Sequence, residues 1–179
     1  MSDLEKILIV VDMQNDFVDG ALGTKEAEEA VAHVVSKIEH FDGRILATLD
    51  THYEDYLDTQ EGRKLPVPHC IRMTKGWQLN DSVLSALSKK EYKTIEKNTF
   101  GSTSLVEEIG SILKQKELEV ELIGLCTDIC VVSNALLLKA HFPHINISVD
   151  AGCCAGVTPK THQAALDTMK MCQIDIIGD

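Results

Sequence analysis

The stretch KILIVVDMQNDF, residues 6–17, decides the fold class. Its residues 7–11 are all isoleucine, leucine or valine, with no polar residue among them. A strand that shows one face to water alternates apolar and polar residues, whereas a continuous apolar run is typical of a strand that helices cover on both faces. We therefore expect a strand of a buried parallel sheet, with Asp12 directly at its carboxyl end.

Five further apolar runs, rich in β-branched residues, follow along the chain at residues 44–49, 93–96, 119–125, 146–149 and 173–177. Most segments between them carry apolar residues at helical spacing, and one such segment opens with Thr158-Pro159, a typical N-cap followed by a first-turn proline. Strands that alternate with helices pair in parallel through right-handed crossovers. The sequence thus predicts an α/β fold, a three-layer α/β/α sandwich with a six-stranded, mainly parallel sheet.

Length and composition indicate a globular protein in one domain. The 179 residues suit a single core, with 44% apolar and 25% charged residues and no linker, repeat or low-complexity segment. The net charge of -11 argues against a nucleic-acid partner. No apolar run reaches the ~18 residues that span a bilayer, and the acidic N-terminus does not resemble a signal peptide. We expect residues 1–179 to form one cytoplasmic domain with reduced cysteines and no membrane partner.

Three reactive side chains follow predicted strands, at the edge of the sheet where ligands of open parallel sheets bind. Asp12 could serve as a partly desolvated general base, or simply cap a turn. Lys97 could be a catalytic cation, or a surface lysine whose stem covers apolar atoms. If Thr127 or Asp128 caps the next helix, Cys130 lies in its first turn, where the amides and the dipole lower the thiol pKa. The other interpretation of this cysteine is an inert core residue.

Taken together, these three side chains predict covalent catalysis. They supply a thiol, a cation that stabilises its thiolate and a carboxylate that moves protons. The backbone N–H groups near Cys126 and Cys130 could hold a developing oxyanion. The set is a stronger signal than any of its members.

A second cluster lies in residues 50–76, a long stretch that we expect to be irregular and functional. It opens with Asp50-Thr-His52 and continues to Glu61 and His69. Alternate residues of an extended chain point to one side, so Asp50 and His52 can share a ligand. Imidazole and carboxylate suit zinc, iron or manganese and leave positions open for water or substrate. The alternative is a pair of exposed loop histidines.

Five motifs together resemble those of the isochorismatase-like cysteine hydrolases, and among these the nicotinamidases most. They are VDMQNDF at 11–17, DTH at 50–52, PHC at 68–70, Lys97, and GLCTDIC at 124–130. They occur in order over nearly the whole chain. The resemblance implies an isochorismatase-like hydrolase domain over residues 1–179.

The resemblance implies roles for the residues that follow the strands. Asp12, Lys97 and Cys130 match the catalytic triad of these enzymes. The backbone amides of Cys126 and Cys130 match their oxyanion hole, and the bond from Leu125 to Cys126 matches a cis peptide.

It also implies a metal and a ring-binding pocket. One divalent ion, with zinc favoured over iron or manganese, would be held by Asp50, His52, His69 and, as in members with a glutamate ligand, Glu61. The positions that flank an aromatic substrate ring in the family correspond to Phe17, Leu22 and Phe100.

The implied activity is the hydrolysis of nicotinamide to nicotinate and ammonia through a cysteine thioester, a step of NAD salvage, in a homo-oligomer. The alternative is a metal-independent cysteine amidase that acts on another small carboxamide or carbamoyl compound. Three departures bear on this choice: Cys126 replaces a common alanine, residues 65–68 lack a tryptophan, and no histidine fills the fourth metal position. A non-enzymatic binding protein is disfavoured because all three triad residues are present.

Overall fold

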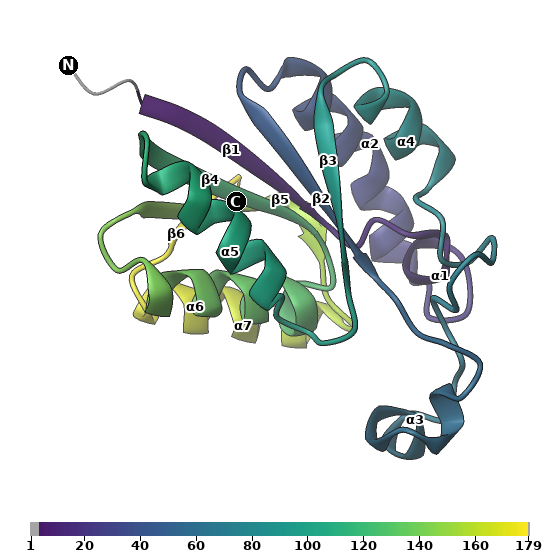
Figure 1. Cartoon of the computed structure of the whole chain (residues 1–179). Coiled ribbons are helices and arrows are strands. Elements are labelled where there is room, and N and C mark those ends of the chain that lie inside the picture. The colour runs from purple at the N-terminus through teal and green to yellow at the C-terminus, as the bar shows by residue number, and fades with distance from the viewer. Residues whose placement is uncertain (1–3, 179) are drawn as a thin grey trace.

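The computed structural model describes residues 4–178 and contains one six-stranded sheet. The strands are β1 (Leu4–Val11), β2 (Arg44–Asp50), β3 (Tyr92–Lys97), β4 (Glu117–Leu125), β5 (Asn146–Ala155) and β6 (Asp175–Ile177). They lie in the order β3-β2-β1-β4-β5-β6, and every neighbouring pair is parallel (Figure 1). The predicted six-stranded α/β architecture is confirmed.

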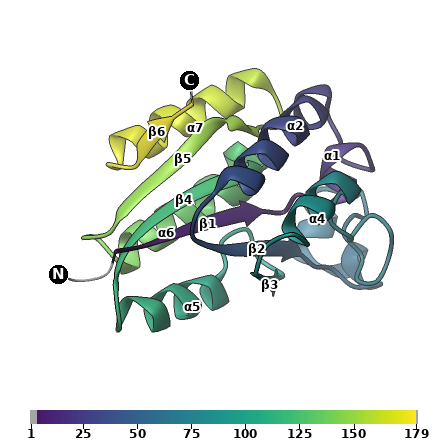
Figure 2. The same ribbon diagram turned by 90° about the horizontal axis from the view of Figure 1, so that it is seen from above.

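Helices cover both faces of the sheet and complete the three layers. One side carries α1 (Asn15–Val18), α2 (Lys25–His40) and α4 (Asp81–Leu87), and the other carries α5 (Thr103–Leu113), α6 (Val132–His141) and α7 (Pro159–Met171). Figure 2 shows α7 beside β5 and β6 at one edge of the sheet. A π-helical turn, η2 (Thr127–Val131), leads into α6.

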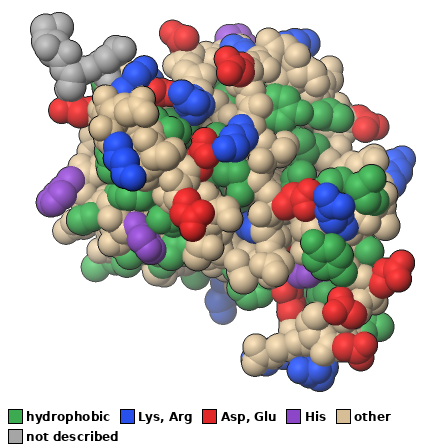
Figure 3. Space-filling model, viewed as in Figure 1, with side chains coloured by type: hydrophobic (Ala, Val, Ile, Leu, Met, Phe, Trp, Pro, Cys, Tyr) green, Lys and Arg blue, Asp and Glu red, His purple; other side chains and the backbone are tan. Residues whose placement is uncertain are grey.

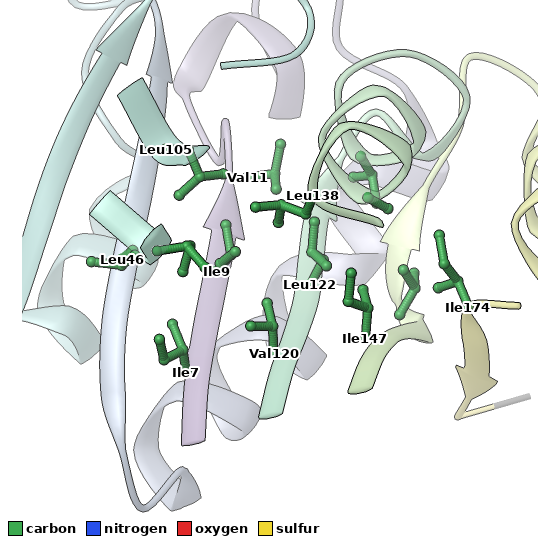
Figure 4. Close-up of a cluster of buried hydrophobic side chains, with 14 of the residues drawn as sticks. Ile7, Ile9, Val11, Leu46, Leu105, Val120, Leu122, Leu138, Ile147 and Ile174 are labelled. Carbon is green, nitrogen blue, oxygen red and sulfur yellow. The ribbon is translucent and has the colours of Figure 1, made fainter. Parts of the chain in front are cut away.

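The central strand β1 contributes to two hydrophobic cores, which explains its continuous apolar run. Ile7, Ile9 and Val11 belong to the core beneath α5, α6 and α7, as Figure 4 shows. Leu8 and Val10 belong to the core beneath α2 and α4, and all five side chains are fully buried. Each such side chain contributes about 1.5–3 kcal/mol on burial, so neither face of β1 tolerates a polar residue.

The stretch expected to be irregular contains two short helical segments. The 3-10 turn η1 (Tyr56–Asp58) and α3 (Gln60–Lys64) form an arm at the carboxyl end of the sheet, and Figure 1 shows this arm away from the main layers. Thr59 caps α3 by accepting a hydrogen bond from the Gly62 N–H. These segments are too short to produce a helical pattern in the sequence.

The last elements agree with the sequence in part. Thr158 and Thr161 form a capping box at the start of α7, as expected from Thr158-Pro159. β5 runs six residues past its expected end at 149, and the β4–β5 register shifts between Leu122 and Gly124. β6 begins later than expected because Gln173 has a positive φ of 64° and cannot continue a strand.

Acidic and basic side chains are interspersed on the face seen in Figure 3. Among the described residues, no helix combines the length and the apolar character that a bilayer span requires.

Candidate functional site

Three chain segments bring Asp12, Lys97 and Cys130 together at the carboxyl edge of the sheet. Asp12 follows β1, Lys97 ends β3 and Cys130 lies in η2. The Lys97 Nζ atom is 2.7 Å from Asp12 Oδ2 and 3.4 Å from Cys130 Sγ. All three residues are buried, with at most 5% of their surface exposed. The structure thus forms the cluster expected from the sequence, with the ammonium between the carboxylate and the thiol.

Thr48 on β2 orients the carboxylate of Asp12. Its hydroxyl donates a 2.6 Å hydrogen bond to Asp12 Oδ1, and its backbone carbonyl accepts from the Asp12 N–H at 3.2 Å. Asp12 has a φ of 47°, an uncommon backbone conformation for a residue other than glycine. The sequence analysis missed Thr48, although a polar residue within a buried apolar strand is a usable signal.

The charges of this cluster depend on its burial. Burial raises the pKa of Asp12, and Lys97 opposes this shift while Asp50 adds to it. Burial alone would lower the pKa of Lys97, but Asp12, Cys130 and Asp50 raise it overall, so the side chain is an ammonium. A carboxylate with a raised pKa beside a fixed cation is a stronger base for a neighbouring thiol.

The expectation of a lowered pKa for the Cys130 thiol is wrong. Burial and the neighbouring Asp12 raise this pKa well above its ordinary value, and the opposing effect of Lys97 is smaller. The favourable effect of a helix dipole on a thiolate is modest, whereas desolvation of the buried thiolate is the largest influence on this thiol. Deprotonation of Cys130 therefore requires a base, and Asp12 is the adjacent one.

The local geometry around Cys130 also differs from the expected capped helix. The turn that contains it is π-helical and has no side-chain cap. The Thr127 hydroxyl instead hydrogen-bonds the His162 ring at 2.7 Å, and the Asp128 carboxylate accepts a backbone N–H from the loop before α7. Both residues join η2 to α7 rather than capping a helix. Such single π-turns are frequent at functional sites.

The chain enters this turn through an unusual backbone. The peptide between Leu125 and Cys126 is cis, as the resemblance implies. Gly124 before it has a φ of 115°, and a Cβ atom there would lie 2.2 Å from the Val11 carbonyl oxygen. Only glycine allows β1 and β4 to approach so closely at this point.

A second cluster, of potential metal ligands, lies beside these residues. Ligand atoms of Asp50, His52 and His69 all lie within 4.8 Å of one another, and all three residues are buried. Asp50 Oδ2 is 3.0 Å from His52 Nε2 and 3.6 Å from His69 Nε2. The arm brings Glu61 close, with its Oε1 atom 3.7 and 3.8 Å from the same two nitrogens.

The donor set fits a divalent cation. Two imidazoles with one or two carboxylates suit zinc, iron or manganese. The His69 Nδ1 atom bonds the Val67 carbonyl at 2.9 Å, which directs Nε2 towards the cluster, as the outer partners of metal-binding histidines do. Burial alone would raise the pKa of Asp50, but His52, His69 and Lys97 hold it below its usual range, so its carboxylate is ionised.

One cavity of about 660 Å³ joins the two clusters. Its wall includes Cys130 and the four residues of the potential metal site. The other predicted site residues in its wall are Phe17, Leu22, Phe100 and Cys126. Asp12 and Lys97 lie behind the thiol rather than in the wall. A small aromatic molecule in this cavity can therefore reach the thiol and a cation at once.

A larger hollow of about 1040 Å³ lies elsewhere, between α2 and the β4–β6 half of the sheet. Lys37 there pairs with Glu121 at 2.6 Å and with Asp150 at 2.7 Å. None of the predicted site residues lines this hollow. The grouping of reactive side chains, rather than size, therefore selects the smaller cavity.

The isochorismatase domain model matches residues 6–178, which is nearly the whole chain. The chain belongs to the isochorismatase domain family. Among relatives, it is 28% identical over 184 residues to a nicotinamidase/pyrazinamidase of Mycobacterium tuberculosis, covering 96% of this chain and 98% of that protein.

Solved structures of this family match the fold closely. A nicotinamidase/pyrazinamidase PncA from Bacillus subtilis has a TM-score of 0.83 and 26% identity, covering 97% of this chain and 99% of that one. A pyrazinamidase of Pyrococcus horikoshii in complex with zinc has a TM-score of 0.77 and 26% identity, covering 98% and 99%. In this isochorismatase-family chain, the cluster of Asp50, His52 and His69 points to a divalent metal.

Tyr56 lines the same cavity and was not among the residues predicted from the sequence. It is almost fully buried, and its ring lies edge-on to His52 and His69, with centroids 4.8 and 5.1 Å away. Its hydroxyl donates to the Leu65 carbonyl at 2.9 Å and so closes the arm onto the two histidines. A lone tyrosine in an irregular stretch offers no pattern, so only the folded arm reveals this contact.

Proposed function

We propose that this chain is an amidohydrolase that converts nicotinamide to nicotinate and ammonia through a thioester on Cys130. One observation carries the proposal: the thiol of Cys130 and the ligand cluster of Asp50, His52 and His69 line the same cavity. A carboxamide at the thiol then places the pyridine ring towards the cluster. The names of the relatives from Mycobacterium tuberculosis and Bacillus subtilis support this substrate.

In the first half of the reaction, Asp12 accepts the thiol proton of Cys130. Lys97, 3.4 Å from the sulfur, stabilises the thiolate that results. The thiolate attacks the amide carbon, and the backbone N–H groups of Cys126 and Cys130 hold the oxyanion. The carbon–nitrogen bond breaks as Asp12 returns its proton to the leaving nitrogen, which departs as ammonia.

In the second half, water opens the thioester. Asp12 takes a proton from the water as its oxygen attacks the acyl carbon, and the same two amides hold the second oxyanion. The carbon–sulfur bond then breaks, the sulfur recovers a proton from Asp12, and the carboxylic acid product leaves and releases its remaining proton to water as nicotinate. One carboxylate with a raised pKa can serve both halves because it accepts one proton and returns it within each half.

The metal site has a positioning role in this proposal. Asp50, His52, His69 and Glu61 would hold one divalent ion, with zinc favoured over iron or manganese. When bound, the ion supplies a Lewis-acid position for the pyridine nitrogen and so orients the ring. The flanks of the ring would contact three apolar side chains of the cavity wall, those of Phe17, Leu22 and Phe100.

The test is ammonia release from nicotinamide, with and without a chelator, alongside a non-pyridine carboxamide such as a maleamate-like acid. We expect rapid release from nicotinamide only, loss of activity with the chelator, and recovery on adding zinc. Cys130→Ala should reduce turnover to background. Near-normal turnover by this variant would refute the thioester, and chelator-insensitive hydrolysis of the second amide would favour a metal-independent amidase. Cytoplasmic location and homo-oligomeric assembly stay predictions.

A further inference from the structure

The turn between β1 and α1 contains a buried residue that the proposed reaction does not use. Asp12 and Phe17 have roles in the reaction or the pocket, but Gln14 between them has none. Its side chain is fully buried, although glutamine is usually exposed. A buried amide must be hydrogen-bonded to offset its desolvation, so its partners indicate its purpose.

The side-chain amide of Gln14 pairs with the backbone of Asp50. Its Oε1 atom accepts a hydrogen bond from the Asp50 N–H, and its Nε2 atom donates to the Asp50 carbonyl, each at 2.8 Å. The second Nε2 hydrogen is donated to the Trp77 carbonyl, also at 2.8 Å. Gln14 therefore holds both backbone groups of Asp50, as a neighbouring strand would, at the residue where β2 ends.

Asp50 is the residue at which the two clusters of the site meet. Its Oδ2 atom is 3.0 Å from His52 Nε2, and its Oδ1 atom is 3.4 Å from Lys97 Nζ. A small shift of its backbone would change the ligand geometry and the position of the ammonium together. The two hydrogen bonds from Gln14 to this backbone can therefore fix both the ligand geometry and the position of the Lys97 ammonium.

Asp16, in the helix α1 that follows this turn, holds the chain beside His69. The Asp16 Oδ2 atom accepts a hydrogen bond from the Cys70 N–H at 2.8 Å, one residue after His69. Gly76 passes so close that a Cβ atom there would lie 2.1 Å from the same carboxylate oxygen. Gln14 and Asp16 thus contact the backbone of both segments that carry Asp50, His52 and His69.

From these contacts we infer that Gln14 is a positioning residue that fixes the Asp50 carboxylate for metal binding and, through the metal, for substrate orientation. The inference rests on the proposed function, because it assumes that the ligand cluster binds a divalent ion. Outer partners of metal ligands typically change metal affinity or activity about 10–100-fold when they are removed.

The matched pair of variants is Gln14→Met and Asn15→Ala. Methionine keeps the length of the side chain but loses all three hydrogen bonds. Asn15 is the next residue along the chain, at the start of α1, and its side chain donates a 2.8 Å hydrogen bond to the Lys75 carbonyl rather than to Asp50. Comparing the two variants therefore distinguishes the loss of any hydrogen bond in residues 14–15 from the specific loss of the bonds to the Asp50 backbone.

The measurements are zinc dissociation constants from competition with a chromophoric chelator, and kcat and KM for nicotinamide in excess zinc. We expect Gln14→Met to weaken zinc binding about 10–100-fold and to raise KM more than it lowers kcat. Asn15→Ala should stay within about twofold of the wild type in all three quantities, because the metal ligands keep their partners.

A Gln14→Met protein that is folded and binds zinc as tightly as the wild type would overturn the inference. If Asp50→Ala then weakens zinc binding, the metal site and the proposed function stand without it. If the wild type itself binds no zinc, the inference and the metal part of the proposal both fail. If Gln14→Met does not fold, Gln14→Glu takes its place. The glutamate keeps an acceptor for the Asp50 N–H but lacks both amide donors. Unchanged zinc affinity of Gln14→Glu would overturn the inference in the same way.

Discussion

Replacing Thr48 by valine removes the two hydrogen bonds that its hydroxyl makes with Asp12, while the Asp12 N–H keeps the Thr48 carbonyl as its acceptor. Thr48 is fully buried on β2, and its hydroxyl donates to Asp12 Oδ1 at 2.6 Å. Valine has nearly the same shape but cannot donate. The ionised carboxylate loses a donor that favoured it, so we expect the pKa of Asp12, which burial already raises, to rise further.

The size of this pKa shift follows from the strength of the hydrogen bond that the Asp12 carboxylate loses. A hydrogen bond to a charged group contributes about 1.5–3 kcal/mol, and 1.36 kcal/mol corresponds to one pKa unit. The pKa of Asp12 should therefore rise by about 1–2 units. Asp12 acts as a base only when it is ionised, so activity is lost as the pH falls through this pKa, and the variant should lose it at a higher pH. On the acid limb, the rate should fall about 10–100-fold relative to the wild type.

The assay is the pH profile of kcat/KM for nicotinamide, in excess zinc, from about pH 5 to 9. Thr94→Val serves as the control, because Thr94 is exposed on β3 and carries the same chemical change. Protonation of the histidine ligands affects all three proteins alike and cancels in the comparison. If Thr48→Val keeps the acid limb of the wild type, ionisation of Asp12 does not control the rate, and the assignment of the base is wrong.

Three further outcomes are expected. Asp50→Ala should bind less metal than the wild type, measured by elemental analysis, and should raise KM for nicotinamide at least as much as it lowers kcat, because in the proposed function the metal orients the ring. Normal metal content would contradict this. Iodoacetamide followed by mass spectrometry should label exposed Cys172 first and half-buried Cys126 far later, because desolvation raises the pKa of Cys126 to about 12. Early labelling of Cys126 would argue against this raised pKa. Gly124→Ala should not fold, or its free energy of unfolding in urea should fall by roughly 3 kcal/mol or more, because its Cβ would lie 2.2 Å from the Val11 carbonyl oxygen. A variant as stable as the wild type would show that β1 and β4 can separate there.

Local patterns in the sequence determined the layers of the fold. A strand buried on both faces must be apolar throughout, so residues 7–11 identified the central strand without further information. Thr158 and Pro159 marked the start of α7 because capping depends only on adjacent residues. Residues at strand ends, such as Asp12, Asp50 and Lys97, could be grouped because carboxyl ends of parallel strands share one edge of the sheet. Glu61 and His69 follow no strand, and only the resemblance implied their place in the ligand cluster.

Tertiary structure decided the electrostatics and the supports of the site. The sequence placed Cys130 at a helix start and so predicted a low thiol pKa, but burial and Asp12, which comes from 118 positions earlier in the numbering, raise it instead. The parts played by Thr48, Gln14 and Tyr56 depend on contacts made across strands and loops. A local sequence pattern indicates which side chains must be buried. The desolvation and the hydrogen-bond partners of a buried side chain depend instead on the distant parts of the chain that pack around it.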